Sequence, residues 1–328
     1  MRFLLYLLGF TALLYATVLL FIFLNIRRGL QWFSKPSPEG KFVDAHGMKL
    51  YYRVKGKGEP VVVVINAIGS AQAEWWPIQN EVGSKFRTIT WERAGYGWST
   101  PDENSRNAAN IAQELDVILK SEKIKKPVFL VAHGTGSVYA RFYAITRPQN
   151  VRGALFIDPL PVKYKHWLNT INEIEECPNL FEAALKKKKL ATRGFYRLFP
   201  LFKGYKLDKR YKRDIIEHYA RSENYDTMQL EYSQLESSLK EMEVEGDFPP
   251  IPLMVLYPSN ESLIREWVRN GVPEYSARQL GRLHHELSGD ILKISPKTTL
   301  LEVEKAGEHI HLSKPDIVVR EILAMLGE

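Results

Sequence analysis

Hydrophobic and polar positions divide the chain into segments with different periods. Residues 42–55, FVDAHGMKLYYRVK, alternate on both sides of a polar turn, as the two strands of a hairpin do. Four later runs are rich in β-branched or apolar residues: VVVVI (61–65), TITW (88–91), VFLVA (128–132) and GALFI (153–157). Residues 107–124 and 137–148 instead place apolar side chains at helical spacing. Strands that alternate with helices predict a doubly wound, mostly parallel sheet of the α/β class.

Residues 160–248 break this alternation. They have helical spacing, many lysines and aromatic residues, and no apolar β run. The strand pattern returns at 251–259, IPLMVLYPS, and at 298–307, TTLLEVEKAG, before a final helical pattern. We therefore expect one sheet domain formed by residues 42–159 and 249–328, with a helical lid inserted at 160–248.

The N-terminal segment shows neither the alternation of a strand nor the spacing of an amphipathic helix, because it is apolar throughout. No charged residue occurs between Phe3 and Asn25, and a helix of that length spans the roughly 30 Å of a bilayer's hydrocarbon. We interpret residues 1–28 as a transmembrane anchor and residues 29–41, with two prolines and two serines, as a linker. A cleaved signal peptide is the alternative, but such peptides have a shorter apolar core and a cleavage site flanked by small residues.

The charges around this segment say little about the side on which the domain lies. Arg2 and the terminal amine lie on one side, and Arg27, Arg28 and Lys35 lie on the other. The positive-inside rule then leans slightly towards a cytoplasmic domain. The single cysteine, Cys177, excludes an internal disulfide framework but does not identify the compartment.

Net charge bears on the partners. The formal net charge is +7 and the pI about 9.2, which favours anionic partners such as nucleic acid or a membrane surface. Residues 185–213 combine many lysines and arginines and one acid, Asp208, with these aromatics: Phe195, Tyr196, Phe199, Phe202 and Tyr205. Such a segment suits an anionic bilayer, and a solvated lid whose aromatics pack inward is the alternative. Beside a membrane anchor, nucleic acid is not an expected partner.

One strand leads into a tight turn made of small residues. The run at 128–144, VFLVAHGTGSVYARFYA, goes from a strand through the turn into a helix. That order is typical of a nucleophile elbow, G-x-S-x-G, whose apex has a strained backbone and closely packed neighbours. Here the pentad reads Ala132-His133-Gly134-Thr135-Gly136. The small residues are in place, but the apex residue has no side chain.

Together with three other stretches, this segment resembles the α/β-hydrolase superfamily, in its esterase-like and epoxide-hydrolase-like branch with a helical lid. Residues 66–76, NAIGSAQAEWW, resemble the loop that supplies half of the oxyanion hole. Residues 91–99, WERAGYGWS, resemble the family's D-R-x-G-x-G-x-S turn, with Glu92 in place of aspartate. Residues 304–315, EKAGEHIHLSKP, resemble the loop of the catalytic histidine. The resemblance implies an α/β-hydrolase fold over residues 42–328 apart from the lid.

The resemblance also implies a triad, and two of its positions are substituted. Gly134 occupies the nucleophile position. The ungapped match to the family's A-G-H-x-x-H-L-x-x-P places Glu308 at the histidine position, which His309 reaches only if the loop shifts by one residue. The implied acid is either Asp158 or Glu261.

Three further residues receive roles from the same resemblance. The backbone N–H groups of Ile68 and Thr135 are implied to form the oxyanion hole. The Thr135 hydroxyl is interpreted as a group at a helix start rather than as a nucleophile. His133 stands where the family commonly carries a structural histidine.

The substitutions decide the function that we expect. Loss of the serine or histidine of a comparable triad costs on the order of 10⁶ in kcat, so ester hydrolysis through an acyl-enzyme is not expected. We expect a pseudo-hydrolase that binds a small hydrophobic or acyl ligand between lid and sheet. The alternative is an active hydrolase in which Glu308 or His309 activates a water. A third interpretation is that the natural protein has serine at 134 and that the glycine was introduced.

No cofactor or metal is expected. The G-x-G in RAGYGWS is not followed by the further glycine of a dinucleotide site. His284 and His285 are adjacent, and neighbouring side chains on a helix point about 100° apart, so we interpret them as part of a solvated helix face.

Overall fold

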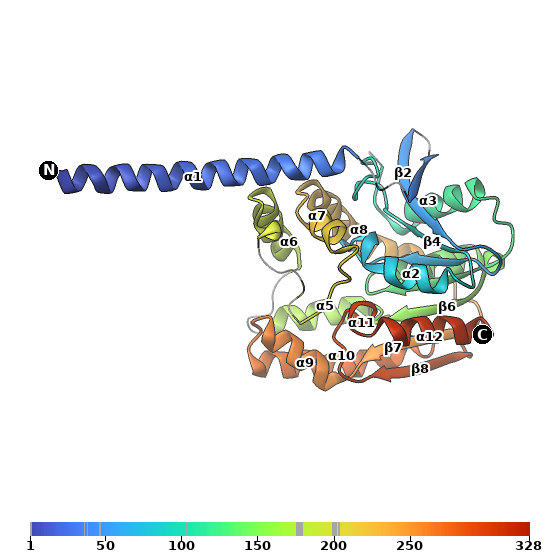
Figure 1. Ribbon diagram of the computed structural model, residues 1–328. Helices are drawn as coiled ribbons and strands as arrows, with labels where there is room; N and C mark the ends of the chain where they lie inside the picture. Colours follow the sequence, from blue (N-terminus) through green and yellow to red (C-terminus); the bar gives the residue numbers. More distant parts are fainter. Residues whose placement is uncertain are drawn as a thin grey trace.

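The protein was analysed as a computed structural model that describes residues 2–35, 37, 39–45, 47–102, 104–174, 180–198, 202 and 204–328. Cys177 and Phe199, which were singled out above, lie outside the described residues. The strands are β1 (Gly40–Ala45), β2 (Met48–Lys55), β3 (Val62–Ile65), β4 (Thr88–Trp91), β5 (Val128–His133), β6 (Val151–Ile157), β7 (Leu253–Pro258) and β8 (Thr298–Val303). They form one sheet in the order β1-β2-β4-β3-β5-β6-β7-β8 (Figure 1).

The sheet is mostly parallel, as the sequence predicted. Strands β1 and β2 pair as an antiparallel hairpin and β2 pairs antiparallel with β4, whereas the remaining pairs are parallel. The helices are α1 (Arg2–Phe33), α2 (Trp76–Val82), α3 (Ala108–Ser121), α4 (Gly136–Thr146), α5 (Tyr164–Glu173), α6 (Leu180–Thr192), α7 (Lys212–Tyr219), α8 (Glu223–Glu245), α9 (Asn260–Arg269), α10 (Glu274–Ile291), α11 (Ile310–Ser313) and α12 (Pro315–Met325).

Both faces of the central strands are covered by helices. In β5, Leu130 packs in one apolar layer with residues of α3 and α4. Its neighbour Val131 points to the opposite face and packs with residues of α2 and α12. Successive side chains of a strand alternate between faces, so a strand with two covered faces is apolar throughout. This is why the central strands are unbroken hydrophobic runs in the sequence.

Helices α5 to α8 form a helical insertion between β6 and β7, in the stretch where the sequence predicted helices (Figure 1). Its helices α7 and α8 contact the loops that follow the carboxyl ends of β3 and β4. Nε2 of His218 on α7 lies 3.2 Å from the carbonyl oxygen of Gly69. The guanidinium of Arg93 donates two hydrogen bonds of 2.8 Å to the carboxylate of Glu231 on α8. The insertion therefore lies over the sheet edge that bears the elbow.

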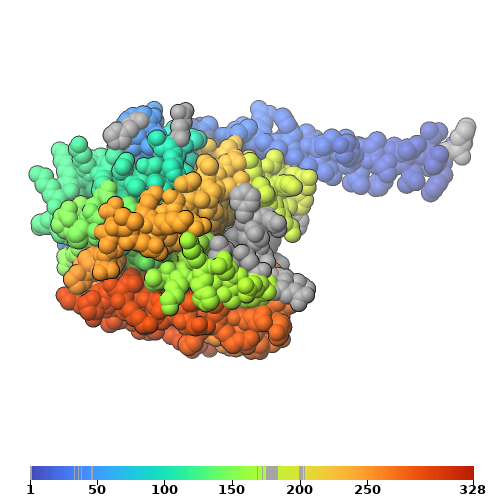
Figure 2. All heavy atoms as spheres, turned by 180° about the vertical axis from the view of Figure 1, so that it is seen from behind, coloured from blue at the N-terminus to red at the C-terminus, as the bar shows by residue number. Residues whose placement is uncertain are grey.

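Helix α1 projects away from the rest of the molecule (Figures 1 and 2). Residues 2–32 form a helix long and apolar enough to span a membrane, and a signal sequence would meet the same criterion. The helix ends at Phe33, so residues 29–33, which we assigned to the linker, are helical. Its last turns contact the insertion: Asn25 is buried, and the guanidinium of Arg213 lies 4.3 Å from the ring centre of Trp32.

Candidate functional site

The turn between β5 and α4 has the backbone conformation of a nucleophile elbow. Gly134, at its apex, has φ of +52°, in the left-handed region that side chains rarely adopt. A Cβ atom placed there would meet only the Cβ of Ala67, at 3.4 Å. A Cβ on Gly136 would lie 2.5 Å from the carbonyl oxygen of Ile65, so glycine is required at that position. The chain keeps the elbow and leaves open space where its side chain would stand.

The expected oxyanion hole is partly occupied by the protein itself. The backbone N–H of Ile68 donates a 2.7 Å hydrogen bond to the Thr135 hydroxyl oxygen. Thr135 is the residue at the start of α4, as expected, but its hydroxyl makes no capping bond to that helix. The hydroxyl instead engages one of the two N–H groups that the resemblance assigns to an oxyanion hole.

Glu308 lies in a cluster of acidic and aromatic side chains beside the elbow. The Trp267 indole N–H donates a 2.7 Å hydrogen bond to its carboxylate. Nε2 of His284 lies 2.8 Å from the carboxylate of Asp158, which directly follows β6 and has φ of +42°. Burial, and then the charge of Asp158, raise the pKa of Glu308 to about 7. Two carboxylates and one imidazole thus gather at the end of β6.

The structure separates the remaining candidates. Glu261 lies on the exposed side of α9 with its carboxylate 3.7 Å from Arg265, so it is not an acid of this site. His285 is exposed, as expected, but the interpretation of His284 as part of a solvated face is wrong, since it pairs with Asp158. His309 is close to the site, with its ring centre 5.3 Å from that of His133.

Three histidines next to the elbow are held neutral. His133 places Nε2 3.1 Å from the carbonyl oxygen of Glu308, and His311 places Nε2 3.1 Å from the carboxylate of Glu74. Burial lowers the pKa of His309 and of His311 to about 3, and that of His133 well below its ordinary value. General bases work best with a pKa near the operating pH. Of the two groups that the sequence offered as a base, Glu308 therefore fits that role and His309 does not.

The pKa of Glu308 predicts how stability changes with pH. A carboxyl whose pKa is raised by folding contributes stability at low pH that is lost as the pH rises from about 4.5 to about 7. Glu308→Gln keeps an acceptor for the Trp267 indole N–H. Because glutamine does not ionise, the variant does not lose stability as the pH rises. We expect the free energy of unfolding of the variant to exceed that of the parent by on the order of 1–3 kcal/mol at pH 8, and the two proteins to have similar melting temperatures at pH 4.5. Thermal melts of both proteins across this range test it, and parallel curves would contradict it.

Comparisons with known proteins agree with this geometry. A family model described as alpha/beta hydrolase fold matches residues 60–213. An AB hydrolase superfamily protein of Gibberella zeae is 21% identical over 309 residues, which cover 85% of this chain and 91% of that protein. The uncharacterized protein YqjL of Bacillus subtilis is 28% identical over 105 residues, which cover 32% of this chain and 42% of that protein. The latter match thus spans less than half of the relative.

A solved structure gives the same architecture. The Cif epoxide hydrolase from Acinetobacter nosocomialis superposes with a TM-score of 0.68 at 18% identity, covering 92% of this chain and 96% of that one. At this identity the likeness concerns the fold. The features of this fold that stand out in the present chain are the strand order of the sheet and the left-handed backbone at Gly134, after β5. The chain therefore has an α/β-hydrolase fold, and the family model of that description matches its residues 60–213.

Proposed function

We propose that the protein is a membrane-anchored pseudo-hydrolase that binds a small hydrophobic or acyl ligand and does not form an acyl-enzyme with it. The proposal rests on Gly134, which stands at the elbow apex without an attacking atom. The bond from the Ile68 N–H to Thr135 supports it, because that amide is already engaged. Loss of the nucleophile removes turnover and leaves space at the apex, where a Cβ would meet only that of Ala67.

The surroundings of the elbow favour an uncharged ligand. Histidines in water are partly protonated near neutral pH, whereas burial keeps His309 neutral here. Aromatic rings of the insertion surround it, with those of Phe202 and Tyr205 centred 5.2 and 5.4 Å from its own. A desolvated environment of neutral imidazoles and aromatic rings suits an acyl chain better than a charged substrate. In this proposal the insertion acts as a lid over the ligand.

The membrane part of the proposal rests on α1. Large apolar side chains along it are exposed, among them Phe3, Leu13 and Phe23. A solvated helix with such a surface would be costly in water, and a bilayer would remove that cost. The exposed Leu185 and Leu198 of the insertion lie on the segment that contacts the end of α1, which suits contact with the bilayer surface.

The test uses the full chain in nonionic detergent micelles. Binding of a fluorescent fatty acid is measured for the parent and for Ala67→Trp, which would fill the space in front of Gly134. We expect the substitution to weaken binding at least tenfold, while Ala324→Trp, a matched substitution at an exposed position, leaves it unchanged. We also expect no covalent labelling of the parent by a serine-reactive phosphonate. Equal binding by both variants, or labelling of the parent, would contradict the proposal.

A second function is favoured by one observation, the pKa of Glu308 near 7. In that function the oxygen of a water molecule attacks an ester carbonyl carbon. The Glu308 carboxylate takes a proton from this water during the attack. The tetrahedral intermediate then expels the alcohol, which receives the proton from Glu308. The Thr135 N–H would face the developing oxyanion, and the substrate would displace the Thr135 hydroxyl from Ile68.

The two functions differ in a measurable rate. Water-mediated hydrolysis requires turnover of activated esters that falls about 100-fold or more in Glu308→Gln, since a general base contributes 10²–10⁴-fold. Glu302→Gln, at an exposed position of β8, is the matched control. A parent rate at background, equal in both variants, excludes this second function and agrees with the first.

A further inference from the structure

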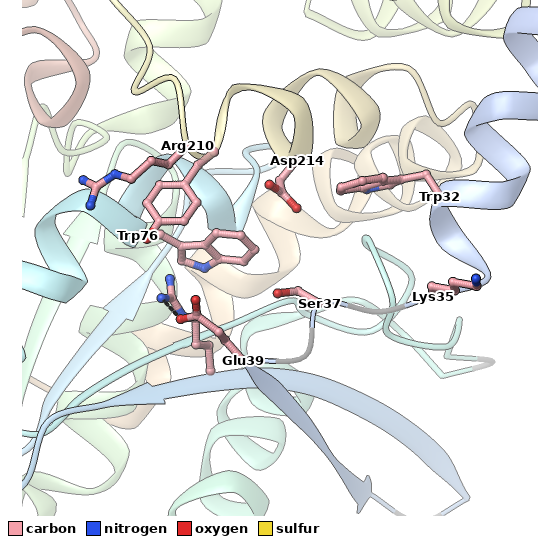
Figure 3. A pocket seen from close by; sticks show the side chains of 9 residues that line it. Trp32, Lys35, Ser37, Glu39, Trp76, Arg210 and Asp214 are labelled. Atoms are coloured by element: carbon pink, nitrogen blue, oxygen red, sulfur yellow. Dashed lines mark hydrogen bonds and ion pairs between the residues drawn. The ribbon is translucent and has the colours of Figure 1, made fainter.

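A cavity of about 380 Å³ lies where the end of α1 meets the sheet domain. It is separate from the elbow, and the residues that matter for its chemistry are Trp32, Lys35, Glu39, Trp76, Arg210 and Asp214. Figure 3 shows the Asp214 carboxylate between the side chains of Trp32 and Trp76, with Lys35 and Arg210 further out. The cavity therefore has a carboxylate and two indoles inside and cations at its rim.

Asp214 forms no ion pair within the cavity, although the charges of Arg213 and Arg53 act on it from a distance. Arg53, which also lines it, is 1% exposed and pairs with Glu39, so these two charges neutralise each other. Arg210 pairs with Asp208, at 2.7 Å. Asp214 has no ion-pair partner among the described residues, and burial raises its pKa to about 6, so it is ionised at neutral pH. An unpaired carboxylate beside indole rings is the chemistry that recognises an alkylammonium group.

The cavity is next to the lipid headgroups if α1 spans a membrane, and the inference rests on that part of the proposed function. The uncharged stretch of α1 ends at Asn25, and at 1.5 Å per residue Trp32 lies about 10 Å further along the helix axis. The headgroup region extends roughly 5–8 Å beyond the hydrocarbon on each side. Trp32 and the cavity mouth would therefore lie a few Å beyond the headgroup region, on its aqueous side, within reach of the terminal ammonium of a headgroup.

The end of α1 is held against the helix that supplies Asp214. A Cβ on Gly29 would collide with Nη2 of Arg197, so α1 and this arginine are in close contact. Arg197 in turn donates hydrogen bonds of 2.9 and 2.8 Å to the carboxylate of Glu217 on α7. This contact fixes α7, and with it Asp214, beside the membrane-proximal end of α1.

We propose that this cavity binds the zwitterionic headgroup of a membrane phospholipid, with the ammonium group at Asp214 between Trp32 and Trp76 and the phosphate beside Lys35 and Arg210. The order of charges matches that of the lipid. In such a headgroup the ammonium is terminal and the phosphate lies nearer the glycerol. In the cavity the carboxylate is inside, and Lys35 lies at the rim, three residues past Trp32.

The experiment measures binding of short-chain lipids to the full chain in nonionic detergent micelles by titration calorimetry. The probes are dihexanoyl phosphatidylcholine and dihexanoyl phosphatidic acid, which lacks the ammonium group. We expect Asp214→Asn to weaken phosphatidylcholine binding at least tenfold and to leave phosphatidic acid binding unchanged. We expect Lys35→Gln to weaken both lipids to the same degree. Asp226→Asn, an exposed aspartate of α8, is the matched control and should change neither.

Three outcomes would overturn the inference. They are equal phosphatidylcholine affinity in Asp214→Asn and the parent, equal affinity of the parent for both lipids, and competition by free glycerophosphocholine at the affinity of the lipid. The last would assign the site to a soluble phosphodiester. Alkaline carbonate extraction of the full chain from membranes tests the insertion of α1 separately. Retained phosphatidylcholine binding in Ala67→Trp separates this cavity from the ligand site at the elbow.

Discussion

The doubly substituted protein Gly134→Ser/Glu308→His is expected to react with a fluorophosphonate probe at least 100-fold faster than Gly134→Ser alone. The elbow already has the left-handed apex that a nucleophile requires, and a Cβ there meets only Ala67 at 3.4 Å. The histidine at position 308 would lie within range of the Asp158 charge, which now raises the pKa of Glu308. A histidine base supported by an acid contributes far more than an isolated hydroxyl can, because a general base alone is worth 10²–10⁴-fold.

The controls separate the nucleophile from the base. Gly134→Ala/Glu308→His has the base but no hydroxyl, and we expect it to remain unlabelled. Melting temperatures of all variants establish that they are folded. Equal labelling of Gly134→Ser and the double variant would mean that another group serves as base, and the assignment of Glu308 to the histidine position would be wrong. Because Thr135 still engages the Ile68 N–H, we expect the double variant to react more slowly than a complete site would.

The fold was predictable because its signals are local. Strands covered on both faces must be apolar throughout, and the run around Leu130 therefore identified β5 from its residues alone. The elbow was predictable for a similar reason. A Cβ atom on Gly136 would lie 2.5 Å from a backbone carbonyl oxygen, so only glycine fits at that position. Constraints of this kind act on single positions and appear directly in the sequence.

The site depended on contacts between distant parts of the chain. His284 and Asp158 are 126 positions apart, and nothing in the sequence near either one predicts the pair. A partial signal existed: Leu280 and Leu287 lie four positions before and three after His284, and both are buried. That spacing puts His284 on the apolar face of α10 rather than in solvent. The bond between Ile68 and Thr135 had no such signal, since it depends on the separation of two loops.

Substitution of Glu231 is expected to cost about 3–5 kcal/mol of stability, the largest effect among the substitutions considered. Its carboxylate is fully buried and accepts two 2.8 Å hydrogen bonds from Arg93, with Arg106 3.4 Å away and the Tyr96 hydroxyl 3.1 Å away. Burial opposes ionisation of Glu231, but the two arginines outweigh it and its pKa lies below the ordinary value. Glu231→Gln leaves the buried guanidinium of Arg93 without its counter-charge, whereas Arg106 keeps its ion pairs with Glu114 and Asp102.

The measurement is thermal unfolding of the full chain in nonionic micelles, followed by tryptophan fluorescence. We expect the melting temperature of Glu231→Gln to fall by roughly 5–15 °C at pH 7. Glu236→Gln is the matched control, because Glu236 lies on the same helix and its pairs with Lys165 and Lys240 are exposed, so we expect an unchanged melting temperature.

The pH dependence of this effect follows from the sign of the pKa shift. A carboxyl whose pKa is lowered by folding contributes stability above its ordinary pKa and loses it as the pH falls through the folded value. The difference between the parent and Glu231→Gln should therefore shrink below about pH 4. Since Glu231 joins α8 of the insertion to the turn after β4 at Arg93, its loss should also open the insertion and speed proteolysis between residues 180 and 245. Unchanged melting and unchanged proteolysis would mean that the insertion is held to the sheet domain by its apolar contacts alone.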